Sequence, residues 1–462
     1  MKAYDLAVIG SGPGGYVAAI RAAQLGMQVA LIEEAEIGGV CLNWGCIPSK
    51  AILTAAERYE ELREGWIPGV RVQDLSPDYD AVIEASRKAA ERLTRGVRSL
   101  MRKNRIEVLQ GRGRLSDGGT VTVSSEAGQT AVEARHTLLA TGSTEFVFPG
   151  VEVDGKRVLT SREALESRTL PDSIAVVGGG AVGLEFAYIY AAYGVQVTLI
   201  EMQDQLVPGL DREVAEALAS SFTRRGVKLA LGTTFRGVES DGEGVLVSVE
   251  GEKGEAELRV DQMLLAVGRR ALVDDLGLEQ AGVEVERGFI ATRADYRTSA
   301  EGVWAIGDVI GPPLLAHKAS EEGKAAVEFM AGVRKQPVDL NRVPACIYCQ
   351  PQIASIGLSE EQARAQGHDV RVGKVPFAAN GKAVGSGHTE GFVKLVSEAR
   401  YGEILGAQAI GAGVTELIAE IGLAMTLEST VHEVGATSHA HPTLSEVIME
   451  AALAADGAAI HF

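Results

Sequence analysis

The chain has 462 residues, of which 46% are hydrophobic and 23% charged, and its formal net charge at pH 7 is −18. This length exceeds one ordinary hydrophobic core, so we expect two to four domains in a globular protein. The acidic balance argues against nucleic-acid binding through phosphate contacts, and no run of about 18 apolar residues predicts a membrane span.

Only four cysteines occur, in two close pairs, Cys41/Cys46 and Cys346/Cys349. This number is too small for a secreted disulfide scaffold of such length. The first five residues carry neither a basic signal-peptide region nor an Arg-rich transit segment. We therefore expect a cytoplasmic protein in which any disulfide serves chemistry.

An apolar strand, a glycine turn, a helix, a second strand and an acidic residue follow one another over residues 6–33. The same order recurs without a gap over residues 174–201. Each copy predicts a βαβ unit with the G-x-G-x-x-G pattern of a dinucleotide site. The pattern glycines are Gly10, Gly12 and Gly15 in the first copy and Gly178, Gly180 and Gly183 in the second.

Each glycine of this pattern has a physical role. The first makes the tight turn, the second lets a pyrophosphate approach the backbone, and the third allows the helix to pack closely on the sheet. Glu33 and Glu201 close the two copies and are placed to accept hydrogen bonds from a ribose. Because Glu201 would repel a 2′-phosphate and Met202 stands where an arginine could attract one, NAD is favoured over NADP. Two strand–turn–helix units without nucleotides are the alternative.

Cys41 and Cys46 lie five positions apart. On a regular helix the axial rise alone would separate them by about 7.5 Å, beyond ordinary disulfide reach. A bond therefore requires that Cys41 lie at or before a distorted helix start, with Gly45 easing the distortion. Cysteines at such a position are expected to have a lowered thiol pKa. From the spacing alone, buried structural thiols are an equally good interpretation.

Further helices and strands are expected outside the two copies. Residues 81–104 predict a helix whose basic side is solvated. Strands are predicted over residues 121–123, 137–140, 245–249, 264–267, 354–356 and 392–395, and helices over 414–427 and 444–454. The character of the sequence changes near Leu340, and because no low-complexity linker marks a boundary, closely packed domains are expected.

His441 differs from the other seven histidines because Pro442 follows it directly and Glu446 lies five residues later. A carboxylate that orients an imidazole fixes its tautomer and raises its basicity. Without further context, a satisfied core histidine is the more common interpretation. Cys346 and Cys349 form a C-x-x-C, but the sequence has no second pair to complete a zinc site, so we expect structural thiols there.

The stretch from Cys41 to Lys50, Cys-Leu-Asn-Trp-Gly-Cys-Ile-Pro-Ser-Lys, closely resembles the active-site signature of the pyridine nucleotide-disulfide oxidoreductases. Its Ile-Pro-Ser-Lys ending resembles the members that oxidise dihydrolipoyl groups, whereas glutathione reductases more often end in Val-Pro-Lys-Lys. Trp44 stands where Val is common in the family and Val40 where Thr is usual, and both changes could tune the flavin pocket. Five further blocks match in order, at residues 140–143, 266–270, 305–308, 316–319 and 439–446.

The resemblance implies an α/β fold with two Rossmann-like dinucleotide-binding domains, for FAD and NAD, and a C-terminal α+β dimerisation domain. The first sequence copy would bind FAD and the second NAD. The expected domains are residues 1–148 for FAD, 149–270 for NAD, 271–341 for a central domain that completes the FAD site, and 342–462 for the dimer interface.

The resemblance also implies catalytic roles. Cys41 and Cys46 would form the redox-active disulfide. Lys50, paired with Glu185, would lie near flavin N5, where a buried cation stabilises developing negative charge.

A second set of implied roles concerns the acid/base and the cofactors. His441 with Glu446 would be the acid/base, reaching the disulfide across a two-fold dimer interface, with His439 in support. Cofactor contacts are implied for Thr141, Gly142, Ser143, Gly268, Ala316, and Asp308, which would hold the ribityl chain.

The function implied is oxidation by NAD of the dihydrolipoyl groups of 2-oxo acid dehydrogenase or glycine cleavage complexes. The implied partners are a second copy of the chain and the lipoyl and subunit-binding domains of an acyltransferase. One alternative is a reductase of another small disulfide, against which Glu201 argues. A flavin NADH dehydrogenase or diaphorase is another and would not require two cysteines. A non-catalytic assembly component is the third.

Overall fold

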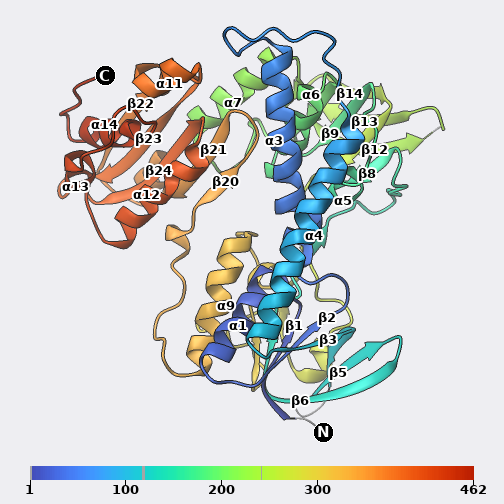
Figure 1. The fold of residues 1–462 in the computed structure, drawn as a ribbon. Coiled ribbons are helices and arrows are strands. Elements are labelled where there is room, and N and C mark those ends of the chain that lie inside the picture. Colours follow the sequence, from blue (N-terminus) through green and yellow to red (C-terminus); the bar gives the residue numbers. More distant parts are fainter. Residues whose placement is uncertain (1–2, 117–119, 241) are drawn as a thin grey trace. The chain divides into compact units, whose positions relative to one another are not determined.

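The computed structural model describes residues 3–116, 120–240 and 242–462, which fall into two compact units (Figure 1). The first unit combines Met1–Ala51, Ala81–Phe146 and Gly268–Leu340. The second combines Ile52–Asp80, Val147–Val267 and Asn341–Phe462. Two helices run through residues of both units, α3 (Cys46–Arg63) and α4 (Tyr79–Lys103).

The first unit is built on a mixed sheet in the strand order β3-β2-β1-β6-β5-β4, with β19 paired to β6. Strands β1, β2, β3 and β19 join in parallel around the carboxyl-terminal half of β6, whereas β4 and β5 extend its other half antiparallel. The bounds are β1 (Ala3–Ile9), β2 (Val29–Glu33), β3 (Glu107–Gln110), β4 (Arg112–Leu115), β5 (Thr120–Ser125), β6 (Gly128–Leu139) and β19 (Val303–Ala305).

Two helices, α1 (Pro13–Gln24) and α9 (Ala316–Met330), lie side by side in this unit (Figure 1). A Cβ added to Gly323 would come within 2.5 Å of the Gly14 carbonyl oxygen, so glycine is required where the two backbones meet. Apolar side chains of both helices and of β1 and β2 form one buried cluster. The remaining elements are α2 (Gly39–Trp44), β7 (Ser143–Glu145), β16 (Arg269–Ala271), α8 (Leu278–Ala281), β17 (Val285–Glu286), β18 (Phe289–Ile290) and two 3-10 turns, η2 (Gly307–Ile310) and η3 (Leu340–Arg342).

The second unit contains a parallel sheet in the order β11-β10-β9-β15-β8. A three-stranded antiparallel sheet, β12-β13-β14, shares a buried apolar cluster with it. The strands are β8 (Val158–Thr160), β9 (Ser173–Val177), β10 (Gln196–Ile200), β11 (Lys228–Ala230), β12 (Thr234–Ser240), β13 (Val245–Gly251), β14 (Gly254–Val260) and β15 (Gln262–Leu265). The helices are α5 (Ser161–Ala164), α6 (Ala181–Ala192) and α7 (Arg212–Arg224).

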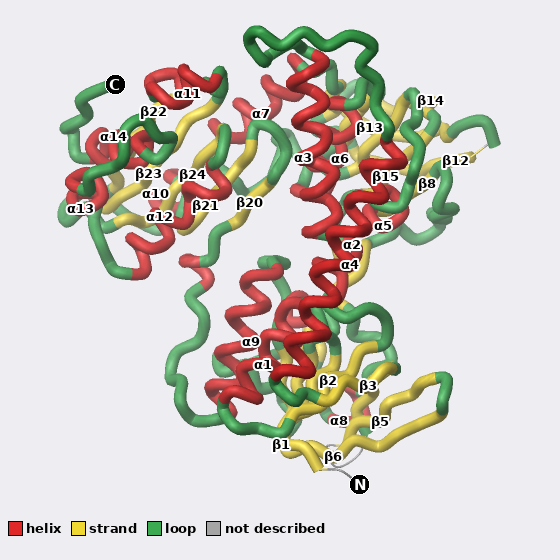
Figure 2. Tube along the Cα trace, in the orientation of Figure 1, coloured by secondary structure: helices red, strands yellow, loops and turns green. Residues whose placement is uncertain are grey.

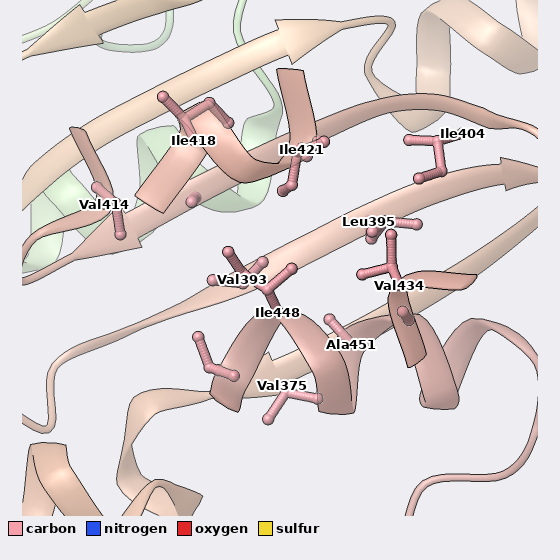
Figure 3. Close-up of a cluster of buried hydrophobic side chains, with 14 of the residues drawn as sticks. Val375, Val393, Leu395, Ile404, Val414, Ile418, Ile421, Val434, Ile448 and Ala451 are labelled. Carbon is pink, nitrogen blue, oxygen red and sulfur yellow. The ribbon is translucent and has the colours of Figure 1, made fainter. Parts of the chain in front are cut away.

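The carboxyl-terminal part of this unit is an antiparallel sheet in the order β20-β21-β24-β23-β22, with helices beside it (Figure 2). Side chains of α12, α13 and α14 meet those of β23 in a buried apolar cluster (Figure 3). The strands are β20 (Ala345–Ile347), β21 (Gln352–Gly357), β22 (Val370–Pro376), β23 (Gly391–Glu398) and β24 (Ile404–Gly411). The helices are α10 (Glu360–Ala365), η4 (Phe377–Ala379), α11 (Gly381–Ser386), α12 (Val414–Thr426), α13 (Val431–Ala436) and α14 (Glu446–Ala455).

The predicted α/β fold, with two Rossmann-like units and a carboxyl-terminal α+β part, is confirmed. The helix predicted over 81–104 is α4, and each predicted strand is present. Several ends differ, among them the end of β6 at Leu139, the end of β15 at Leu265 and the start of the last predicted helix at Glu446. Both strands therefore end one or two residues early, before Gly142 and Gly268, where the backbone has positive φ. Within the described ranges, no helix has the length and apolar character needed to cross a bilayer.

A buried lysine joins the parallel-sheet part of the second unit to its carboxyl-terminal part. Lys394 on β23 is 4% exposed, and its Nζ lies 3.0 Å from Asp211 Oδ2, 2.7 Å from Glu213 Oε2 and 2.8 Å from Glu360 Oε2. Asp211 caps the start of α7, so the contact links the parallel-sheet part to the carboxyl-terminal part. Burial alone would lower the pKa of Lys394, but its hydrogen bonds to the three carboxylates raise it above the usual value.

We expect Lys394→Met to lower the free energy of unfolding by about 3–5 kcal/mol, because it leaves buried carboxylates without their shared cation. Lys374→Met is the matched control: Lys374 pairs with Glu213 at a half-exposed position and should cost about 1 kcal/mol or less. Urea unfolding at one protein concentration measures both. Equal stability of Lys394→Met and the unmodified chain would contradict the proposed contribution of the cluster.

The same variant gives a pH test of this cluster. Burial opposes the shift at Glu213, but hydrogen bonds to Lys374 and Lys394 outweigh it and hold the pKa of Glu213 below its usual value. The hydrogen bond from Lys394 likewise lowers the pKa of Glu360. A carboxylate with a lowered pKa stabilises the fold above its ordinary pKa and loses this contribution as pH falls through the lowered value. The deficit of Lys394→Met should therefore shrink in acid.

Candidate active site

The first glycine turn joins β1 to α1 and carries a carboxylate bound to its backbone. Gly10 has φ +98°, and a Cβ there would come within 2.3 Å of the Ala140 carbonyl oxygen. A Cβ on Gly15 would come within 1.9 Å of the Gly10 carbonyl oxygen. Glu33, at the end of β2, is 8% exposed, and its Oε2 accepts hydrogen bonds from the Ser11 amide at 2.8 Å and from Ser11 Oγ at 2.6 Å. Close backbone contacts therefore require glycine at positions 10 and 15, and Glu33 holds the turn through Ser11.

The second turn, between β9 and α6, repeats this geometry. Gly178 has φ +113°, and a Cβ on Gly183 would come within 1.9 Å of the Gly178 carbonyl oxygen. Glu201 is 9% exposed, and its Oε2 accepts from the Gly179 amide at 2.7 Å while its Oε1 accepts from the Gln203 amide at 2.8 Å. The sequence repeat is therefore a repeat of hydrogen bonds as well.

Both turns present features that fit a dinucleotide. Nothing lies within 4 Å of a Cβ built on Gly12 or Gly180, the residues that precede α1 and α6. Neither helix start has a side-chain cap or an acidic residue in its first turn. Unpaired N–H groups and the positive end of each helix dipole are therefore available to a pyrophosphate.

Asp308 follows β19 in the first unit, and Ser143 Oγ donates to its Oδ2 at 2.5 Å. Arg269 in turn donates from Nε to Ser143 Oγ at 2.8 Å and from Nη2 to the Ser143 carbonyl oxygen at 2.7 Å. The structure therefore brings Ser143 and Asp308 together, and their contact with a flavin stays a prediction. Thr141 Oγ1 donates to the Leu272 carbonyl oxygen at 2.8 Å, so its hydroxyl fixes the same segment.

Sequence reasoning missed the buried pair that holds the Asp308 turn. Lys318 is 1% and Glu322 3% exposed, and their Nζ and Oε1 lie 3.2 Å apart. Glu322 Oε2 accepts from the Gly307 amide at 2.8 Å, and Lys318 donates to the Gly311 carbonyl oxygen at 3.0 Å. Burial raises the pKa of Glu322 despite the nearby Lys318 cation. Both residues belong to α9, whose first residue, Ala316, is one of the predicted cofactor contacts.

The two cysteines lie on either side of a helix break. Cys41 is in α2, Gly45 interrupts the helical path with φ −153° and ψ −111°, and Cys46 begins α3. Both thiols are half-buried and interact with each other. A hydrogen bond to Cys46 and burial raise the pKa of Cys41, and the Lys50 cation opposes this rise. The expectation of a lowered thiol pKa is therefore wrong for Cys41, because the hydrogen bond with a second thiol and burial outweigh the effect of the Lys50 cation.

Glu185, predicted to pair with Lys50, lies in α6 of the second unit and is 6% exposed. Its Oε1 accepts from the Tyr348 amide at 3.1 Å. The pairing with Lys50 stays a prediction. Gly268, predicted to contact the second nucleotide, has φ +130°, and its carbonyl oxygen accepts from the Phe146 amide at 3.1 Å.

The predicted imidazole–carboxylate pair is present in the second unit. His441 Nδ1 lies 2.9 Å from Glu446 Oε1, and Glu446 Oε2 accepts from the Thr443 amide at 2.8 Å. These two hydrogen bonds, first the amide and then the imidazole, lower the pKa of Glu446. The His441 side chain is 78% exposed, which leaves its Nε2 open to a reactant.

His439 has a carboxylate partner that the sequence did not indicate. Its Nε2 lies 2.7 Å from Glu420 Oε1 and its Nδ1 lies 2.9 Å from the Thr437 carbonyl oxygen. The segment that carries His441 is therefore tied to α12.

The second cysteine pair differs from the first. Cys346 lies on β20 opposite Ala354 of β21, and Cys349 is fully buried, with its Sγ 3.5 Å from the Pro351 carbonyl oxygen. No group of three or more metal-binding side chains occurs in the part of the chain that the structure describes. These contacts agree with structural thiols.

Comparisons with known proteins identify a family and close relatives of this chain. A family model described as pyridine nucleotide-disulphide oxidoreductase matches residues 4–323, and the model of that family's dimerisation domain matches residues 343–452. The chain is 44% identical over 462 residues to a dihydrolipoyl dehydrogenase of Zymomonas mobilis subsp. mobilis, with 99% of each chain covered. It is 46% identical over 454 residues to a dihydrolipoyl dehydrogenase of Chlorobaculum parvum, covering 98% of this chain and 97% of the relative.

Solved structures of two other proteins are similar to this chain over nearly its whole length. LpdA from Mycobacterium tuberculosis is similar with a TM-score of 0.92 at 30% identity, covering 98% of this chain and 99% of that one. RclA from Escherichia coli, a flavoprotein disulfide reductase induced by HOCl, is similar with a TM-score of 0.87 at 26% identity, with the same coverage of 98% and 99%.

Proposed function

The chain belongs to the pyridine nucleotide-disulphide oxidoreductase family, and we propose that it is a dihydrolipoyl dehydrogenase, which oxidises dihydrolipoyl groups with NAD. The observation that carries this proposal is the Cys41–Cys46 pair beside Lys50, in the same unit as the first glycine turn. Curated dihydrolipoyl dehydrogenases that are 44% and 46% identical over nearly the whole chain support it.

The cofactors are FAD in the first turn and NAD in the second. Bound flavin supplies the electron acceptor for the reduced cysteine pair and the hydride for the nicotinamide. In the first unit we assign Gly12 and Glu33 to the adenosine and pyrophosphate side, and Asp308 with Ser143 to the ribityl side. In the second unit Gly180 and Glu201 hold the corresponding part of NAD. Thr141, Gly142, Gly268 and Ala316 complete the proposed contacts.

The reaction begins with a proton transfer to His441. Because Nδ1 faces Glu446, the substrate thiol gives its proton to Nε2. The resulting thiolate attacks Cys41 Sγ, the Cys41–Cys46 bond breaks, and Cys46 leaves as a thiolate. The second substrate thiol then displaces Cys41 and closes the lipoyl disulfide. Two electrons have entered the cysteine pair, and one proton stays on each of Cys41 and His441.

The raised pKa of Cys41 supports this distribution of protons, because the neighbouring Cys46 sulfur and burial both favour the protonated form of Cys41. Lys50 is assigned to the flavin side of the pair, with Glu185 as its counter-ion. A cation there favours a cysteine thiolate and negative charge on a reduced ring.

The chain carries the family's dimerisation domain and is a homodimer. We further propose that it binds the lipoyl and subunit-binding domains of a 2-oxo acid dehydrogenase acyltransferase. A cytoplasmic location fits a chain whose four cysteines include a working thiol pair. We also propose the four domains 1–148, 149–270, 271–341 and 342–462.

Steady-state rates test the proposed substrate. The chain should oxidise dihydrolipoamide with NAD at least about 100-fold faster than it reduces glutathione disulfide with NADPH, because correct positioning of the dithiol contributes to the transition state. A faster rate with glutathione disulfide would reject the proposal and favour a reductase of another small disulfide.

Glu201 gives a test of the nicotinamide preference. We expect Glu201→Gln to shift the ratio of kcat/KM for NADP over NAD by about 10- to 100-fold towards NADP, because it removes the charge that repels a 2′-phosphate. Glu216→Gln is the matched control, since Glu216 is an exposed carboxylate on α7 of the same unit. An unchanged ratio in Glu201→Gln would remove Glu201 from the specificity site.

A further inference from the structure

Residues 41–46, from one cysteine to the other, are called the redox loop below. The residues at its centre make contacts of their own with the surrounding structure. Trp44, between Cys41 and Cys46, ends α2, and its Nε1 donates to Glu36 Oε2 at 3.3 Å. The guanidinium of Arg87 on α4 lies 4.5 Å from the centre of the Trp44 ring. An arginine stacked on an indole is a favourable cation–π contact.

The neighbouring residue is fixed in the same way. Arg87 Nη2 donates to the Asn43 backbone carbonyl oxygen. Asn43 Nδ2 donates to the Gly39 carbonyl oxygen at 2.9 Å, and its Oδ1 accepts from Thr94 Oγ1 of α4 at 3.0 Å. Residues 43 and 44 are thus attached to α4 and to the turn before α2.

We propose that Trp44 and Arg87 form a clamp on the redox loop that sets the balance between its disulfide and its dithiol. The inference rests on the proposed function, which supplies the Cys41–Cys46 disulfide. By this role both clamp residues are positioning residues.

The physical argument concerns the freedom of a short helix. The helix α2 has six residues, too few to be stable by itself, so its position depends on outside contacts. Gly45, which separates α2 from Cys46, adds further backbone freedom. If the clamp is removed, the reduced loop gains conformations in which the sulfurs lie apart, and disulfide formation must then overcome this entropy. The clamp therefore favours the disulfide.

Geometry, and not the charge of Arg87, is the proposed cause. The cation that acts on the Cys41 thiol is Lys50. Arg87 engages the loop through a planar guanidinium that stacks and donates at the same time, and a lysine cannot reproduce both contacts. If the clamp acts through geometry, Arg87→Lys should shift the equilibrium between disulfide and dithiol as much as Arg87→Met does. If the charge of Arg87 were the cause, Arg87→Lys should leave this equilibrium unchanged.

The experiment equilibrates the holoenzyme without oxygen against a series of reduced and oxidised dithiothreitol ratios. Each dithiothreitol gives up two electrons and two protons and closes its own S–S bond as the Cys41–Cys46 bond breaks. Alkylation followed by mass spectrometry then counts the thiols at both positions. We expect Arg87→Met and Arg87→Lys each to shift the equilibrium about tenfold towards the dithiol, which equals about 30 mV.

Matched variants separate the clamp from other effects. Arg95→Met removes an exposed arginine of α4 that pairs with Glu91, and it should leave the equilibrium unchanged. Trp44→Val should shift the equilibrium in the same direction as Arg87→Met. The double variant should shift it by less than the sum of the two, because both act on one contact. Thermal unfolding and the flavin absorption spectrum verify that each variant is folded.

The possible results are distinct. An equilibrium in Arg87→Lys equal to that of the unmodified chain would overturn the clamp in favour of charge, and no shift in either Arg87 variant would overturn both. Failure of the unmodified chain to form a Cys41–Cys46 disulfide at any ratio would instead reject the proposed function.

Discussion

A Cys41→Ser variant is expected to oxidise dihydrolipoamide more than about 10⁴-fold more slowly than the unmodified chain, because thiol–disulfide exchange with the substrate cannot begin without this sulfur. Transfer of electrons from NADH to an added quinone should fall far less, since it needs the two nucleotide sites and no thiol. The measurement is the ratio of the two steady-state rates. A collapse of this ratio by at least about three orders of magnitude identifies the thiol pair as the working group.

Cys346→Ser is the matched control for this experiment, because Cys346 lies on β20 of the carboxyl-terminal sheet. It should keep the dihydrolipoamide rate within about twofold, as expected of a conservative substitution at a structural thiol. Full dihydrolipoamide activity in Cys41→Ser would show that the sulfur pair is dispensable. The diaphorase would then be the better assignment.

Removal of the imidazole has the second largest expected effect. His441→Gln should lower kcat/KM for dihydrolipoamide by about 10²- to 10⁴-fold, the usual contribution of a general base. The Thr443 amide and His441 lower the pKa of Glu446, which favours the carboxylate that faces the imidazole. Glu446→Gln should therefore also lower kcat/KM, because the imidazole loses the carboxylate that orients it.

Mixed dimers test whether His441 acts on its own subunit or on the neighbouring one. Cys41→Ser and His441→Gln dimers are each inactive, but in a mixed dimer one cysteine pair can meet an intact imidazole only across the interface. Equal mixing followed by exchange of subunits should restore about a quarter of the normal activity, since half of the dimers are mixed and each has one complete site. No recovery despite proven exchange would place the imidazole and the disulfide in one subunit.

The duplicated nucleotide units could be predicted from sequence because their determinants are local. Each glycine and its closing carboxylate lie within one βαβ unit, and the repeat preserves their spacing. The structure adds that Glu33 and Glu201 bind amides of their own turns, through Ser11 and Gly179. The sequence predicted a ribose as the partner of each carboxylate, but it did not predict the hydrogen bond from the turn amide.

The support of the active groups could not be predicted because it depends on contacts between distant segments. Arg87 reaches Asn43 from another helix, and Glu420 reaches His439 from α12. Neither pair has a periodic signal, because the contact depends on how two elements pack and not on the residues next to either one. The raised pKa of Cys41 was missed for a similar reason, since it depends on burial and on the contact with the Cys46 thiol, which the spacing of the two cysteines does not determine.

The buried Lys394 cluster limits how the second unit can move during turnover. Sliding or hinging between its parallel sheet and its carboxyl-terminal sheet would pull the Lys394 ammonium group away from the carboxylates of Asp211 and Glu213 at the start of α7. Such a separation is costly unless water enters to replace every contact. The nucleotide-binding part and the dimerisation part of the second unit should therefore move as one rigid body. A displacement of the second glycine turn would then displace His441 as well.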